Sequence, residues 1–286
     1  MDEQRTPVSS AVISERFLKD SEERYSPRAE DTTCVSQRPV KIALRKVSKE
    51  FRTADRGTFV ALREIEAEIG DGEFVALIGP SGGGKTTLLN VVAGLTPPTG
   101  GQVLVDGRPV RRPGPDRGVV FQQDALFMWR RVIKNVEYGL EIRNVPKDQR
   151  QQTAMDYLRM VGLEKFADFY PKQLSGGMKK RVQIATVFAN NPEVLLMDEP
   201  FGALDYPTKV DLQEQLLTLW ARDAKTSLFV THDMEEALFL ADRVFVLVDG
   251  KLETILNVPF GRPRAHDLRM SQDFHALKLQ LWNYMR

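Results

Sequence analysis

The apolar residues of this chain follow two spacings that alternate along the sequence. In 40–47 (VKIALRKV) and 59–70 (FVALREIEAEIG), apolar and polar residues alternate. This is typical of half-buried strands, because successive side chains of a strand point to opposite faces. Short continuous apolar runs instead predict strands that are buried on both faces. Those runs are 74–79 (FVALIG), 118–122 (GVVFQ), 194–198 (VLLMD) and 227–232 (SLFVTH).

Segments with helical spacing separate these strands. Between the second and third of the continuous runs, Ala154, Leu158 and Val161 fall on one helical face. The pattern therefore predicts an α/β core with a helical subdomain, at about 123–180, inserted into it. Further helices are predicted at 85–95, 212–223 and 273–286, and hairpins around Asp106-Gly107 and in 243–255.

Both ends of the chain differ from this pattern. Residues 1–38 are polar, mix both signs of charge and contain prolines, so we expect a mostly disordered tail. The α/β pattern spans 39–260, which we expect to be one domain. Residues 261–286 are expected to form a C-terminal extension with a short helix.

Composition narrows the classes of function. The formal net charge is +1, with 42% hydrophobic and 28% charged residues, so no strongly basic surface for nucleic acid is expected. Cys34 is the single cysteine, which excludes a disulfide within the chain and leaves an inert thiol as its simplest role. No segment approaches the roughly 18 to 20 apolar residues of a membrane helix, and the first residues lack the features of a secretion signal. We therefore expect any membrane role to come through a partner.

The first chemical motif is a glycine-rich loop after the run 74–79, which fits the pattern G-x-x-x-x-G-K-[ST]. Its glycines let backbone N–H groups converge on a phosphate at a helix N-terminus. Lys85 can reach the β and γ phosphates in a catalytic role, and the Thr86 hydroxyl can ligate Mg²⁺. A flexible glycine turn is the alternative, but it gives no reason for the flanking strand and helix. The predicted binding residues are Gly79, Pro80, Ser81, Gly82, Gly83, Gly84, Lys85, Thr86 and Thr87.

Polar groups end three other predicted strands: Gln122, the pair Asp198 and Glu199, and His232. In open α/β sheets, ligands bind at the carboxyl ends of the strands, so we expect these groups to converge. Asp198 and Gln122 are the further predicted Mg²⁺ ligands. Glu199 is predicted to polarise the attacking water, with His232 and Gln122 as catalytic partners. Taken singly, these residues could equally be an acidic strand cap, a solvent-facing glutamine and a structural histidine.

A second glycine pair occurs in 174–180 (LSGGMKK). Ser175 can cap the helical run from Met178 onward, and Gly176 and Gly177 would expose backbone N–H groups at its start. These residues form a second predicted anion site. One ATP does not need two such sites in one chain, so we expect a dimer in which the second site of each chain covers the ATP of its partner.

Together these motifs resemble the nucleotide-binding subunit of an ABC transporter over about residues 40–260. The chain carries, in the order of that family, the phosphate loop, the Q-loop glutamine Gln122, the signature LSGGM, the acidic strand end LLMDEP, the D-loop ending at Asp205 and the switch histidine His232. The resemblance implies an α/β fold: a P-loop NTPase (RecA-like) core, an antiparallel β subdomain and an inserted α-helical subdomain. It also implies that Phe51 stacks on the adenine and that Asp205 lies near the nucleotide. An ordinary core phenylalanine is the alternative for Phe51.

A narrower resemblance is to the importer ATPases for nitrate, sulfonate, taurine and bicarbonate. It rests on 126–132 (LFMWRRV), 229–244 (FVTHDMEEALFLADRV) and 262–264 (RPR). It implies that Trp129 and Arg130 contact a permease, with core filling as the alternative for Trp129.

Three positions depart from the usual family pattern. Lys180 and Thr186 stand where glutamine and arginine are common, and Met128 stands where proline is frequent. None of these changes removes a phosphate-contacting group, so they bear on the solute and not on hydrolysis.

From the resemblance we expect an ATP-hydrolysing subunit, with ATP and Mg²⁺ as cofactors, that energises uptake of a small anion of the nitrate, sulfonate or taurine kind. Its expected partners are a second copy or a related subunit, a transmembrane permease at the cytoplasmic face of the inner membrane and, indirectly, an extracytoplasmic solute-binding protein. No nucleic-acid partner is expected. The alternatives are an ABC ATPase that acts on DNA or ribosomes and a regulatory or lipid-handling module that drives no import.

Overall fold

The computed structural model describes residues 38–53, 57–202 and 204–285. The tail predicted for residues 1–38, with Cys34, therefore lies outside the described residues except for Arg38. In the described part of the chain, no helix combines the length and the apolar character that crossing a membrane requires.

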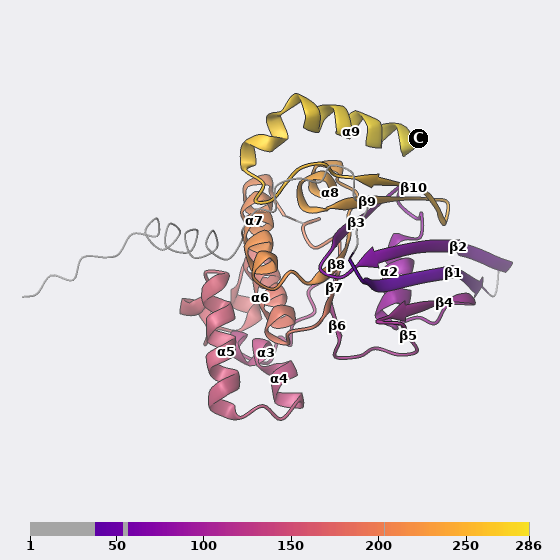
Figure 1. The fold of residues 1–286 in the computed structure, drawn as a ribbon. Coiled ribbons are helices and arrows are strands. Elements are labelled where there is room, and N and C mark those ends of the chain that lie inside the picture. Colours follow the sequence, from indigo (N-terminus) through magenta and orange to yellow (C-terminus); the bar gives the residue numbers. More distant parts are fainter. Residues whose placement is uncertain (1–37, 54–56, 203, 286) are drawn as a thin grey trace, which may run out of the picture. The chain divides into compact units, whose positions relative to one another are not determined.

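Most strands precede a run of helices in the sequence, and strands and helices alternate over residues 176–248 (Figure 1). The strands are β1 (Val40–Thr53), β2 (Gly57–Gly70), β3 (Phe74–Ile78), β4 (Gly100–Val105), β5 (Arg108–Pro109), β6 (Arg117–Val120), β7 (Val194–Asp198), β8 (Thr226–Val230), β9 (Arg243–Val248) and β10 (Lys251–Asn257). The α-helices are α2 (Lys85–Ala93), α3 (Val132–Val136), α4 (Tyr138–Ile142), α5 (Lys147–Met160), α6 (Gly176–Ala189), α7 (Tyr206–Asp223), α8 (Met234–Leu240) and α9 (Gln272–Tyr284). Three short 3₁₀ helices are η1 (Glu164–Phe166), η2 (Pro171–Gln173) and η3 (His266–Met270).

The central sheet has six strands in the order β10-β9-β3-β8-β7-β6. Its five strands from β9 to β6 are parallel, and β10 joins β9 by an antiparallel hairpin. Every residue of β3, β7 and β8 is buried, as predicted from their continuous apolar runs. The carboxyl ends of the parallel strands therefore meet at one edge of the sheet.

The side chains of β3 alternate between two hydrophobic cores. Phe74, Ala76 and Ile78 belong to the core that includes residues of α3, α5, α6, α7, α8 and α9. Val75 and Leu77 belong to the core that includes α2 and the antiparallel sheet. The sheet is therefore covered on both faces, which explains why its central strands carry no polar alternation.

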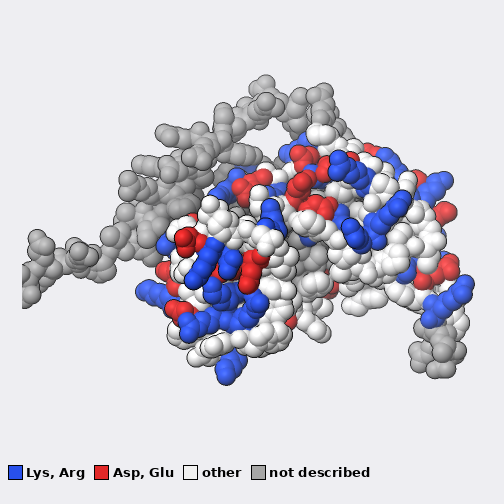
Figure 2. Space-filling view, turned by 90° about the horizontal axis from the view of Figure 1, so that it is seen from below, with Lys and Arg blue, Asp and Glu red and all other residues white. Residues whose placement is uncertain are grey.

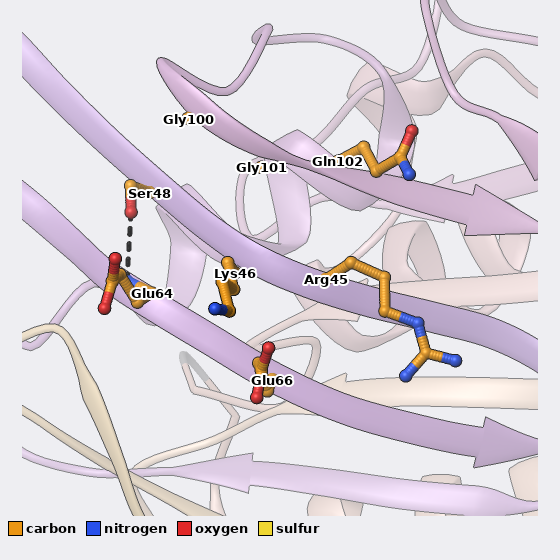
Figure 3. Close-up of a pocket in the computed structure, with 8 residues that line it drawn as sticks. All are labelled: Arg45, Lys46, Ser48, Glu64, Glu66, Gly100, Gly101 and Gln102. Atoms are coloured by element: carbon orange, nitrogen blue, oxygen red, sulfur yellow. Dashed lines mark hydrogen bonds between the residues drawn. The ribbon is translucent and has the colours of Figure 1, made fainter.

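The antiparallel sheet has the order β2-β1-β4-β5. The long β1–β2 hairpin is irregular: Lys46 and Glu64 adopt positive φ values of 50° and 47°, and the pairing register shifts between Leu44 and Val47. An open depression lies over this irregular region, beside the start of β4 (Figure 3). Ser48 accepts a hydrogen bond of 3.0 Å from the Glu64 N–H there. None of the predicted site residues lines this depression.

The C-terminal segment is anchored to the core by Arg262 and an apolar helix face. Arg262 lies over the Trp220 ring at 4.4 Å and bonds Asp242 at 2.9 Å. The α9 residues Phe274 and Leu281 are buried, as the helical spacing of 273–286 predicts.

Two local features differ from the predictions. Helix α8 was not predicted, because its seven residues continue into the apolar strand β9 without a visible change of spacing. Its N-cap Asp233 and the acidic residues Glu235 and Glu236 in its first turn were the available signal. Strand β6 ends at Val120 and β8 at Val230, so Gln122 and His232 each lie two residues beyond the strand and not at its last position.

Candidate functional site

The glycine-rich loop connects the buried strand β3 to the N-terminus of α2. Two of its glycines have no room for a side chain. A Cβ at Gly79 would lie 1.9 Å from the Leu247 carbonyl oxygen. A Cβ at Gly84, which has a φ of +96°, would lie 2.4 Å from the Ala61 carbonyl oxygen. The neighbouring strands β9 and β2 therefore fix the path of the loop through contacts that only glycine allows.

Lys85 is the first residue of α2, and its side chain is buried. Its Nζ donates hydrogen bonds of 2.9 Å to the carbonyl oxygens of Gly79 and Pro80, so the ammonium lies inside the loop. Burial lowers the pKa of Lys85, while Glu199 and Asp198 act in the opposite direction. A partly desolvated ammonium at a helix N-terminus is suited to bind a phosphate.

The hydroxyl of Thr86 faces the carboxyl end of β7. Thr86 Oγ1 donates a hydrogen bond of 3.1 Å to Asp198 Oδ1. Burial raises the pKa of Asp198, and the bond from Thr86 acts in the opposite direction. A cation beside this buried carboxylate would favour its ionised form.

Glu199 is the meeting point of three sequence-distant segments. Its Oε2 lies 3.4 Å from Gln122 Nε2 and 3.2 Å from His232 Nδ1. Glu199 itself has a φ of +40°, and its N–H donates to the Val230 carbonyl oxygen at 2.9 Å. The turn after β7 therefore aims the carboxylate across the sheet edge, between the residues that follow β6 and β8.

The donor set at this edge fits Mg²⁺. Thr86 offers a hydroxyl, Asp198 a carboxylate and Gln122 an amide oxygen, which are the hard oxygen ligands that this ion prefers. The described residues contain no group of three histidine, cysteine or acidic side chains that could hold a metal. A magnesium ion here would therefore take its remaining ligands from phosphate oxygens and water.

The second glycine pair forms a helix start, as predicted, although α6 begins at Gly176 and not near Met178. The Ser175 hydroxyl accepts a hydrogen bond of 3.3 Å from the Met178 N–H. A Cβ at Gly177 would lie 2.8 Å from Thr208 Cγ2 of α7, whereas Gly176 has open space. No hydrogen bond or ion pair among the described residues joins Ser175, Gly176 or Gly177 to the phosphate loop. The two predicted anion sites are thus not linked within one chain.

Phe51 and Asp205 lie at other places in the fold. Phe51 lies on β1 and is 40% exposed, with Lys49 Nζ 5.0 Å from its ring centroid, so it is not an ordinary core residue. Asp205 is the N-cap of α7 and accepts a hydrogen bond of 3.3 Å from the Thr208 N–H. Hydrogen bonds from the side chain and the backbone N–H of Thr208 hold the pKa of Asp205 below its ordinary value.

Trp129 is 74% exposed, which excludes core filling for this side chain. The neighbouring Arg130 lies 4.8 Å over the Tyr138 ring and pairs with Glu141 at 2.9 Å.

The chain is similar in sequence to known ATP-binding proteins. The ABC transporter family profile matches residues 62–202. A putative ATP-binding protein of Brucella abortus (strain 2308) is 49% identical over 229 residues, covering 79% of this chain and 88% of the relative. The nitrate import ATP-binding protein NrtD of Synechocystis sp. is 53% identical over 192 residues, covering 67% of this chain and 72% of the relative.

Solved structures agree with the sequence matches. The dimeric structure of a post-hydrolysis state of the ATP-binding cassette MJ0796, bound to ADP and Pi, has a TM-score of 0.69 to this chain at 35% identity. The match covers 76% of this chain and 98% of the cassette. Likeness in both sequence and fold extends well beyond the phosphate loop, so this chain belongs to the ABC transporter family as one of its ATP-hydrolysing, ATP-binding subunits.

Proposed function

We propose that this chain energises the import of a small anion by binding and hydrolysing ATP at the cytoplasmic face of a membrane permease. The relatives that support this include proteins named for nitrate import and for bicarbonate transport, at 53% and 44% identity. An extracytoplasmic solute-binding protein would deliver the anion to the permease. The 39–260 segment acts as the ATPase domain, with the helical subdomain at about 123–180 and the extension at 261–286.

The convergence of Gln122 and His232 on Glu199 Oε2 is the observation that carries the proposed chemistry. Glu199 polarises the attacking water, because a carboxylate aimed across the sheet edge can accept a proton from it. Gln122 and His232 hold that carboxylate in place and contact the phosphate and the water. Lys85 stabilises the negative charge that develops on the transferred phosphoryl group.

The phosphate loop binds the nucleotide, and Thr86, Asp198 and Gln122 hold its magnesium ion. Mg²⁺ supplies neutralisation of the phosphate charge when it is bound. Phe51 is exposed on β1, where it can stack on the adenine of ATP.

Two copies of the chain form the complete ATPase. Ser175, Gly176 and Gly177 have no bond to the phosphate loop of their own chain, and the first two are exposed. We therefore assign them to the γ-phosphate of the ATP bound by the partner, with Asp205 nearby in the dimer contact. The related cassette structures, which are described as dimeric, support this arrangement.

Trp129 and Arg130 form the contact with the permease. An exposed tryptophan beside an arginine that is held by Tyr138 and Glu141 is a typical anchor for a protein interface. On the face seen in Figure 2, Lys and Arg side chains are interspersed with Asp and Glu. Such mixed charge suits a protein partner better than nucleic acid.

The Glu199→Gln variant tests the catalytic assignment, because the amide keeps the shape and loses the base. We expect ATP to bind with little change while turnover falls by about 10² to 10⁴. Glu193→Gln is the matched control, since Glu193 is an exposed acid that pairs with Lys41 away from the site. Turnover in Glu199→Gln equal to that of the control would refute the assignment.

Co-purification tests the transport assignment. The chain is expected to form a complex with a permease whose ATP turnover rises when solute-loaded binding protein is added. An intact complex whose turnover does not respond to any anion would point to a regulatory or lipid-handling module.

A further inference from the structure

Lys180 is a buried lysine that the proposed chemistry does not use. It lies on α6, five residues after Ser175, and is only 5% exposed. Burial lowers the pKa of Lys180, and Asp124 acts in the opposite direction. Removing an ammonium from water is costly, so its surroundings need to return several strong hydrogen bonds.

Three acceptors surround the Lys180 ammonium. Its Nζ lies 3.0 Å from the Phe121 carbonyl oxygen, 2.9 Å from the Gln122 carbonyl oxygen and 3.0 Å from Gln183 Oε1. An ammonium has three N–H donors, so each of them can have a partner here.

Gln183 extends the same contact by one residue. It stands three positions after Lys180 on α6, on the same helix face, and is 3% exposed. Its Nε2 donates to the carbonyl oxygens of Phe121 at 3.3 Å and Gln123 at 3.4 Å. Two side chains of α6 therefore bind three consecutive carbonyl groups of the segment after β6.

The segment 121–123 depends on these bonds. It follows the last residue of β6 and belongs to no strand or helix, so no ladder or helical hydrogen bond satisfies its carbonyl groups. The side chain of Gln122 points from this segment to Glu199, at 3.4 Å. The position of the Gln122 amide thus depends on backbone that the side chains of Lys180 and Gln183 hold against α6.

We propose that Lys180 is a positioning residue: it ties the segment that carries Gln122 to α6, so that the Gln122 amide and the Ser175 end of α6 move as one unit. This inference rests on the proposed function, because it gives Gln122 a role in hydrolysis and Ser175 a role at the ATP of the partner. Lys180 then links the two ATP sites of a dimer. ATP binding in one site, sensed through Gln122, changes the placement of the helix start that covers the other.

A double-mutant cycle on the full-length chain tests this coupling. We expect Lys180→Met to lower kcat by about tenfold, because the methionine fills the space and offers no donor. The Kd for a non-hydrolysable ATP analogue is expected to change by less than about twofold, since Lys180 has no part in the phosphate loop. In a Gln122→Ala background the same Lys180→Met change is expected to lower kcat by less than about twofold, because the group it positions is gone.

Lys41→Met is the matched control. Lys41 is another largely buried lysine, on β1, which pairs with Asp106 and Glu193. The Lys41→Met variant is expected to have a lower melting temperature and an unchanged kcat. If Lys180→Met does not fold, Lys180→Gln takes its place with a smaller expected loss of kcat, because its amide keeps two N–H donors, and that loss is expected to disappear in the Gln122→Ala background.

The proposal is overturned if kcat is unchanged, or if it falls by the same factor in both backgrounds. Either result would refute the positioning role of Lys180 and would leave the proposed transport function standing. In the unsubstituted protein, ATP turnover without solute import would instead count against the proposed transport function, and it would leave the coupling measurement on Lys180 intact.

Discussion

Replacing Arg264 by methionine is expected to destabilise the protein more than the loss of any ordinary surface arginine. The guanidinium of Arg264 donates to four backbone carbonyl oxygens. Three belong to the last turn of α8 and its C-cap: Leu238 at 3.1 Å, Phe239 at 2.9 Å and Ala241 at 2.8 Å. The fourth belongs to Phe260, which accepts from Nε at 3.2 Å and from Nη2 at 2.9 Å. Burial lowers the pKa of Arg264 to about 10, so the group is still charged at neutral pH.

The size of the loss follows from these contacts. A net hydrogen bond contributes about 1 kcal/mol, so four carbonyl groups without their donor amount to about 4 kcal/mol. Water will reach some of these carbonyl groups, and the variant no longer buries a cation. The expected loss of unfolding free energy is therefore about 2–4 kcal/mol. For a chain of this size that corresponds to a decrease in melting temperature of roughly 4 to 8 °C.

The assay is thermal and urea unfolding of Arg264→Met beside Arg143→Met. Arg143 is exposed and donates one hydrogen bond of 2.8 Å to the Asn190 carbonyl oxygen, so its loss is expected to cost under about 1 kcal/mol. Equal unfolding free energies for the two variants would refute the argument that Arg264 holds the end of α8.

Two further predictions concern the site and its partner. Gly84→Ala is expected to lower ATP affinity by tenfold or more, as a rough figure, because its Cβ would lie 2.4 Å from the Ala61 carbonyl oxygen. Gly82 has a similar positive φ but open space around its Cβ position, so Gly82→Ala is expected to reduce ATP affinity less, as measured by isothermal titration. Equal losses of affinity in the two variants would show that the contact with Ala61 is unimportant. Trp129→Ala is expected to leave the melting temperature within about 1 °C, since the ring is 74% exposed, while abolishing co-purification with the permease. Ile142→Ala, also exposed, is expected to keep the permease bound, and loss of binding in both variants would show that Trp129 is no specific anchor.

Much of the fold was predictable because its patterns are local. Continuous apolar runs marked β3, β7 and β8, and helical spacing marked α2, α5, α7 and α9. Helix α8 escaped because seven apolar-rich residues next to a buried strand show no period of their own. Because β9 is buried on both faces, it lacks the alternation of apolar and polar residues that would distinguish it from α8.

The sequence predicted which residues belong to the candidate site, but it did not predict which of them contact each other. The residues after three strands could be expected at one sheet edge, since parallel strands share their carboxyl ends. That Glu199 contacts both Gln122 and His232 depends on its positive φ, which no sequence pattern indicated. Lys180 was visible only as an unusual residue beside the signature.

The sequence by itself determined most of the elements that this protein has and the family to which it belongs, and it predicted which residues hold a phosphate and a cation. Those properties follow from the spacing of apolar residues and the order of motifs, which can both be read along the chain. Only the tertiary structure decided that Lys180 is buried against two carbonyl groups of a distant loop and that Trp129 is exposed. Both depend on which surfaces meet when the helices pack against the sheet, and long-range packing leaves no fixed spacing in the sequence.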